Sequence, residues 1–189
     1  MDRTLIASNL GLGTHYVILS NQPPDTIQIP TDLLSFHGEI IQVVVTSKSN
    51  YLGYLEELLN VPFVLPPRNC QLIGHQSDNR LAVDCAELAV YGMRRMGYSV
   101  PYAGPHRITD WLVQTDTLKA GTIIHFGHQV SVLYEDNGVI GKLDPDDLLI
   151  HAYKQKAEVI SFGYTDLQSS SYLFYAWDWG KLNKNLNNK

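Results

Sequence analysis

The chain is poor in cysteine and in charged residues. Of its 189 residues, two are cysteines, Cys70 and Cys85, and 17% are charged. Two cysteines cannot form the framework of bridges that stabilises small disulfide-rich proteins. No Cys-x-x-Cys pair occurs in the sequence, which argues against a structural zinc site.

Dense basic runs and long apolar segments are also missing. The net charge is -5, and the lysines and arginines form no cluster, so nucleic-acid binding is not expected. No apolar stretch approaches the roughly 18 residues that a membrane-spanning helix needs. Residues 1–20 lack the basic start, apolar core and small-residue site of a signal peptide. The 44% of hydrophobic residues suffices for one globular domain.

Short runs rich in β-branched residues alternate with turns over much of the chain. Expected strands cover residues 15–20, 39–46, 121–126, 130–136, 148–153, 157–164 and 171–179. Expected helices cover residues 50–60, 83–98 and 108–118. Because the later strands are joined by short turns, they are expected to pair antiparallel. The pattern predicts an α+β fold in which helices pack against one face of an antiparallel sheet.

Three parts of the chain are distinguished by composition. Residues 1–48 form a β-rich N-terminal segment, residues 49–179 form the main domain, and residues 180–189 form a polar tail. The tail carries repeated Asn and Lys and is expected to fray.

The stretch "VDCAELAVYGMRRMGY" places a cysteine at the first turn of an expected helix. Asp84 is a good N-cap, and the positive end of the helix dipole stabilises a thiolate at Cys85. The pattern therefore suits a nucleophilic cysteine. It also suits a core residue, because Cys85 shares an apolar face with Leu88 and Ala89. The helical position of Glu87 favours exposure to solvent or a partner such as Arg94.

Three histidines follow in the strand region, His125, His128 and His151. A cysteine nucleophile needs an imidazole base and a third group that orients it. If the strands that begin at His128 and contain His151 are neighbours, His128 is the base and His151 orients it. His125 and His128 could share a site only if Gly127 forms a bulge or turn. Too few ligands remain for a metal, so neither a metal nor another cofactor is expected.

Four ordered motifs resemble the NlpC-type cysteine peptidases, which are papain-like enzymes. The motifs are "DCAEL" at 84–88, "GTIIHF" at 121–126, "HQVSVLYED" at 128–136 and "IHAY" at 150–153. The extended "VPFVLPP" upstream corresponds to the segment that lines the cleft in that family. The resemblance covers residues 50–165 and implies a papain-like core.

The resemblance implies a hydrolase that cuts amide bonds of peptidoglycan stem peptides, with a peptide or cell-wall peptide as its partner. It assigns Cys85 as nucleophile, His128 as base and His151 as the third residue. It also favours a cell-envelope or secreted location. An alignment without a gap puts Gln129 at the base position, so a bulge is needed to place His128 there. His125 stays as an alternative base.

Two other functions remain open from the sequence. One is acyl transfer or transglutamination by the same residues. The other is a catalytically inactive binding module in which Cys85 belongs to the core and the histidines have no chemical role.

Overall fold

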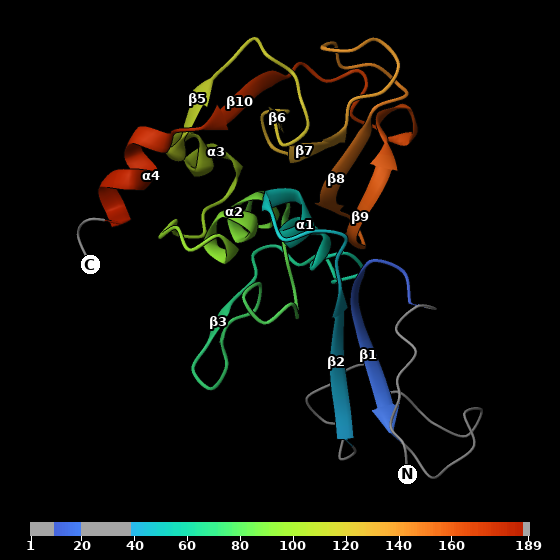
Figure 1. Ribbon diagram of the computed structural model, residues 1–189, viewed down its shortest axis with the longest axis vertical. Helices are drawn as coiled ribbons and strands as arrows, with labels where there is room; N and C mark the ends of the chain where they lie inside the picture. The colour runs from blue at the N-terminus through green and yellow to red at the C-terminus, as the bar shows by residue number, and fades with distance from the viewer. Residues whose placement is uncertain (1–9, 20–38, 187–189) are drawn as a thin grey trace.

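A six-stranded antiparallel sheet is the largest element of the computed structural model, which describes residues 10–19 and 39–186 (Figure 1). Its order is β5-β10-β6-β7-β8-β9, and every neighbouring pair is antiparallel. The strands are β5 (Leu112–Gln114), β6 (Ile123–His125), β7 (Val130–Glu135), β8 (Leu148–Tyr153), β9 (Lys156–Ser161) and β10 (Leu173–Trp177). The expected α+β class and the antiparallel pairing are both confirmed.

Short helices accompany the sheet. They are α1 (Tyr51–Glu56), α2 (Cys85–Arg95), α3 (Pro105–Ile108) and α4 (Trp179–Leu186), with single 3-10 turns at Thr109–Trp111 and Phe162–Tyr164. The longest, α2, packs against α1 and against β7 and β8. No helix in the described part of the chain is long and apolar enough to cross a bilayer.

The two faces of the sheet bury different clusters, because successive side chains of a strand point to opposite faces. We call the face toward α2 the inner face. It contributes Ile123, Val130, Val132, Ile150 and Ala152 to the cluster that contains α2. The outer face contributes Ile124, Leu133 and Leu149 to a second cluster with Phe162 and Leu167.

A two-stranded ribbon extends away from the helices on the side opposite the sheet (Figure 1). It consists of β1 (Gly13–Leu19) and β2 (Glu39–Val45), which pair antiparallel. Thr14 Oγ1 donates to the Glu57 carbonyl at 2.6 Å, and Tyr16 Oη donates to the Arg80 carbonyl at 2.8 Å. The remainder of the expected N-terminal segment, residues 1–9 and 20–38, lies outside the described residues.

The Glu57 carboxylate, although buried, joins the ribbon's attachment point to α2. It accepts hydrogen bonds from the Arg95 guanidinium at 2.9 Å and from the Tyr91 hydroxyl, both on α2. Arg80 lies 3.4 Å from the same carboxylate. Buried charge is tolerated here because two guanidinium groups compensate it.

Two short strands precede α2 and form a small hairpin, β3 (Asn69–Cys70) and β4 (Gly74–His75). Its pairing is limited to two residues on each strand.

The prediction of a helix over residues 108–118 is wrong for most of that range. α3 ends at Ile108, and Leu112–Gln114 forms the edge strand β5, with Leu112 paired to Trp177. Leu112 is buried while Val113 is half exposed, which is the alternation of a strand. Pairing with β10 outweighs the local helical pattern.

Helix α4 (Trp179–Leu186) forms where the sequence predicted the end of a strand and the start of a fraying tail over residues 180–189. Leu182 is 1% exposed, and the Trp179 ring packs against Tyr98 with centroids 5.7 Å apart. Asp178 Oδ1 accepts a hydrogen bond from the Lys181 backbone N–H at 3.2 Å, as an N-cap does. These apolar anchors hold the helix, and residues 187–189 lie outside the described chain.

Gly92 allows α1 to approach α2 closely. A Cβ at this position would lie 2.6 Å from Leu55 Cδ2 and 2.7 Å from Tyr51 Cε2. We expect Gly92→Ala to lower the free energy of unfolding by roughly 1–2 kcal/mol, because overpacking exceeds the gain of about 1 kcal/mol in helix propensity. Urea unfolding at neutral pH measures the change.

Gly104→Ala is the matched control for this substitution. Gly104 has a φ of -68°, and nothing lies within 4 Å of an added Cβ. Its effect should stay within about 0.5 kcal/mol. A Gly92→Ala protein as stable as the wild type would contradict the close approach.

Candidate functional site

Cys85 occupies the first position of α2, as the sequence predicted. Asp84 precedes it in extended conformation, and its Oδ1 accepts a hydrogen bond from the Glu87 backbone N–H at 2.8 Å. The expected N-cap is therefore present. Cys85 is 3% exposed and belongs to the cluster on the inner face of the sheet.

The segment before the small hairpin lies beside the start of α2. Phe63 forms a parallel bridge with Val83, and Val83 N–H donates to the Pro62 carbonyl at 3.0 Å. On its other side, Phe63 N–H donates to the Gln155 carbonyl at 2.8 Å. The extended stretch "VPFV" is thus held between the β8–β9 turn and the residue that precedes Asp84.

Burial raises the pKa of the Cys85 thiol to about 11. The backbone N–H of Val130 hydrogen-bonds to the sulfur and acts in the opposite direction, as do the N–H groups of Ala86 and Cys85. The nearby Asp84 carboxylate adds to the rise. The helix start therefore does not lower the thiol pKa as expected, because loss of hydration outweighs it. At neutral pH the resting group is a thiol.

His128 lies in the four-residue loop, residues 126–129, between β6 and β7. Phe126 N–H donates to the Gln129 carbonyl at 2.8 Å, which closes the loop, and Gly127 has a φ of +82°. A turn at Gly127 is thus present. His128 is exposed, two residues before the Val130 N–H that contacts the Cys85 sulfur.

Within residues 10–19 and 39–186, Cys85 makes no hydrogen bond with an imidazole. The structure brings the loop that carries His128 to the side of α2 where Cys85 lies. It does not join the two side chains directly.

His125, the alternative base, has both ring nitrogens engaged. Nε2 lies 2.9 Å from the Pro105 carbonyl, and Nδ1 accepts a hydrogen bond from Gly127 N–H at 3.0 Å. This pattern requires the neutral tautomer with its proton on Nε2. His125 therefore ties α3 to the loop that carries His128, and its lone pair is not available as a base.

His151 lies on the outer face of the sheet. In β8, Ile150 and Ala152 point toward α2, so the side chain between them points away from Cys85. His151 is 3% exposed, and its Nε2 lies 3.9 Å from Glu158 Oε1 on β9. Burial lowers the pKa of this imidazole. The structure thus does not bring His151 to Cys85.

Gln129 occupies the position that a gapless alignment gives to the base. It is 3% exposed, and its amide N–H groups donate to the carbonyls of Val130 and Ala152, both at 3.3 Å. These bonds fasten the start of β7 to β8. Gln129 has a structural role in fixing the strand whose first N–H meets Cys85.

Glu87 is a buried group whose environment the sequence did not reveal. It is 5% exposed, contrary to the expected solvent position, and its Oε2 lies 2.5 Å from Ser77 Oγ. Burial raises the pKa of Glu87 to about 8. Ser77 Oγ also donates to the Ala82 carbonyl at 3.0 Å, and a hydroxyl has one proton. A protonated Glu87 supplies the second proton that this arrangement needs.

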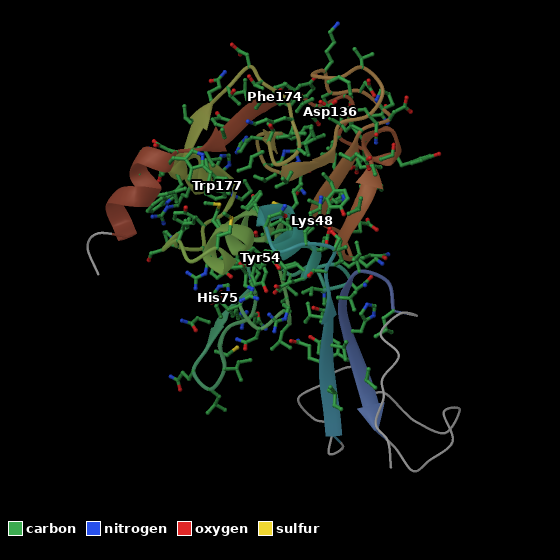
Figure 2. All side chains as sticks on the ribbon, in the orientation of Figure 1. Lys48, Tyr54, His75, Asp136, Phe174 and Trp177 are labelled. Carbon is green, nitrogen blue, oxygen red and sulfur yellow. The ribbon has the colours of Figure 1, made fainter. Side chains whose placement is uncertain are left out.

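A stack of rings and a guanidinium lies beside Glu87. Figure 2 shows His75 on the small β3–β4 hairpin, and its ring stacks on Tyr102 with centroids 4.1 Å apart. The Arg94 guanidinium lies over the Tyr102 ring and donates to Asp78 at 2.8 Å. Arg94 therefore pairs with Asp78 and not with Glu87.

No cluster of three or more His, Cys, Asp or Glu side chains suited to a metal ion occurs among the described residues. No protein-family model matches the chain, and no curated protein or solved structure matches it significantly. The quoted motifs and the geometry around Cys85 are therefore the grounds on which a function can rest.

We predict that Glu87 makes stability depend on pH. Its pKa in the folded chain, about 8, lies above the ordinary value of 4.5. Proton binding therefore favours the folded state, and this stabilisation is complete below about pH 4.5 and is lost as pH rises through about 8. Glu87→Gln should remove that loss, so the variant gains stability relative to the wild type between pH 5 and pH 9, as urea unfolding would measure.

The control is Glu135→Gln, at an exposed carboxyl of β7. This variant should follow the wild-type dependence on pH. Parallel stability curves for wild type and Glu87→Gln would show that the Glu87 carboxyl ionises normally.

Proposed function

We propose that the protein is a cysteine hydrolase that cleaves peptide or isopeptide amide bonds, with peptidoglycan stem peptides as the favoured substrate class. One observation carries the proposal. Cys85 stands at the capped start of α2, and its sulfur meets the N–H of Val130 at the strand that begins beside His128. The substrate class rests on the resemblance of the four motifs to the NlpC-type peptidases.

A raised thiol pKa requires a base during the reaction. The thiol is uncharged at neutral pH, so attack must be coupled to proton transfer. His128 lies in the loop directly before Val130, whose N–H is the hydrogen-bond partner of the Cys85 sulfur. In the proposed reaction it takes the thiol proton as sulfur bonds to the carbonyl carbon, and it then protonates the departing amine.

Backbone donors at the helix start suit the charge that develops on the carbonyl oxygen. The N–H groups of Cys85 and Ala86 act to lower the pKa of the Cys85 thiol, which means that they favour negative charge at the start of the helix. Water activated by His128 then cleaves the thioester and returns the thiol. In the proposed reaction the "VPFV" segment, whose Phe63 forms a bridge with Val83, borders the substrate.

We expect Cys85→Ala to abolish amide hydrolysis and His128→Gln to reduce kcat/KM by roughly 10²–10⁴-fold, the range that general acid–base catalysis contributes. Release of amine from purified stem peptides measures the rates. His15→Gln, on the ribbon, is the matched control and should keep wild-type rates. Hydrolysis that persists in Cys85→Ala would overturn the proposal.

The products of the same reaction distinguish acyl transfer from hydrolysis. Mass spectrometry with an added primary amine would show an amine-linked product for a transferase and only the free acid for a hydrolase.

A second candidate function is a non-catalytic binding module of the same fold. The burial of Cys85, 3% exposed within the apolar cluster, is the observation that favours it. In that case His128 serves no chemical step, and the surface near α2 binds a peptide without cleaving it.

Alkylation of the two cysteines distinguishes these functions. With a pKa of about 11, Cys85 should react with iodoacetamide slowly at pH 7 and faster as pH rises toward 10. Half-buried Cys70 provides the internal comparison. Peptide mapping measures both rates. A Cys85 that stays unlabelled at pH 10 in folded protein would support the binding module and contradict the hydrolase.

A further inference from the structure

A pocket of about 260 Å³ opens on the outer face of the β8–β9 hairpin. Its floor is formed by side chains of the two strands, and its wall by the turn that follows β9. The lining includes His151, Tyr153, Lys156, Glu158, Tyr164 and Asp166. The sheet separates this pocket from Cys85.

Two buried polar atoms lie at or beside the pocket without a hydrogen-bond partner in the described chain. They are Nδ1 of His151 and Oγ of Ser131, on residues that are 3% and 1% exposed. Val132 pairs with Ile150, so the same register sets Ser131 opposite His151 on the outer face. A buried polar group without a partner costs about 1–3 kcal/mol, and such groups are rare outside sites that use them.

The pocket also carries one carboxylate and one ammonium that lack a charged partner among the described residues. Glu158 has His151 as its nearest basic neighbour, at 3.9 Å. Burial lowers the pKa of His151, so that imidazole is neutral at pH 7 and leaves the carboxylate uncompensated. Lys156 contacts only an amide oxygen, Asn60 Oδ1, at 3.3 Å.

The other charged pair of the pocket is satisfied. Lys154 Nζ donates to Asp166 Oδ2 at 2.8 Å and lies over the Tyr153 ring. The two charges of this pair therefore compensate each other, and their contact joins the β8–β9 turn to the segment after β9 at the rim of the pocket.

We propose that this outer pocket binds a small zwitterion, an α-amino acid or a dipeptide, with its ammonium at Glu158 and its carboxylate at Lys156. The two residues lie two positions apart on β9, about 7 Å between their Cα atoms. The flexible Lys156 side chain can adjust this span to ligands of either length. Tyr164, 85% exposed, offers its ring to the ligand's side chain.

Ligands of a single charge fit the pocket less well. A simple anion near Lys156 meets the Glu158 carboxylate, and a simple cation near Glu158 meets the Lys156 ammonium. A zwitterion neutralises both groups at once. This site lies beyond the proposed hydrolase function, and either can fail without the other.

The test uses the full chain and calorimetric titration with L-alanine and L-alanyl-L-alanine. N-acetyl-L-alanine lacks the ammonium and L-alanine amide lacks the carboxylate, so both should bind at least about tenfold more weakly. Glu158→Gln and Lys156→Gln should each weaken zwitterion binding by a similar factor. Amide NMR shifts confined to β8 and β9 would locate the site.

Glu135→Gln and Lys142→Gln, on β7 and in the β7–β8 loop, are the charge-matched controls and should bind as the wild type does. The proposal is overturned if neither zwitterion shows saturable binding. It is equally overturned if both pocket variants bind as the wild type, or if the single-charge analogues bind as tightly as L-alanine.

Discussion

The burial of helix α2 is the constraint on which the other features depend. Its residues from Cys85 to Met93 are all buried, and the helix packs against α1, β7 and β8. Such packing stabilises the fold through apolar contact, but it removes water from every polar group that the helix carries. The Cys85 thiol and the Glu87 carboxyl consequently both favour their uncharged forms. A helix start alone does not produce a thiolate when desolvation is this complete.

The sheet divides the molecule into two chemical environments. Its inner face holds Cys85 against β7, while its outer face holds His151 against Glu158. Strand residues alternate between the two faces of a sheet. Cys85 and His151, which belong to one ordered set of sequence motifs, are therefore separated by the full thickness of the sheet. The tight β6–β7 loop avoids this division, since His128 lies at the end of two central strands and not within a strand.

Much of the fold follows from local pattern, and less of the site does. Alternation and turns predicted β6 to β9 and their antiparallel pairing, and Asp84 with Cys85 predicted the start of α2. The position of His151 was also encoded, because "LIHA" places Ile150 and Ala152 on one face and the histidine on the other. β5 could not be foreseen, since its paired residues in β10 lie 61 to 65 positions away in the sequence. The burial of Glu87 depends on Ser77, in a loop whose path no periodicity reveals.

Glu57 connects the β1–β2 ribbon to helix α2 through two different groups, its carbonyl and its carboxylate. The ribbon hydrogen-bonds to the carbonyl of Glu57 through Thr14, and the same residue's carboxylate holds Arg95 and Tyr91 of α2. The ribbon is thus connected to the helix that begins with Cys85 through Glu57 and also through Arg80, whose carbonyl accepts a hydrogen bond from Tyr16 and whose guanidinium lies 3.4 Å from the Glu57 carboxylate.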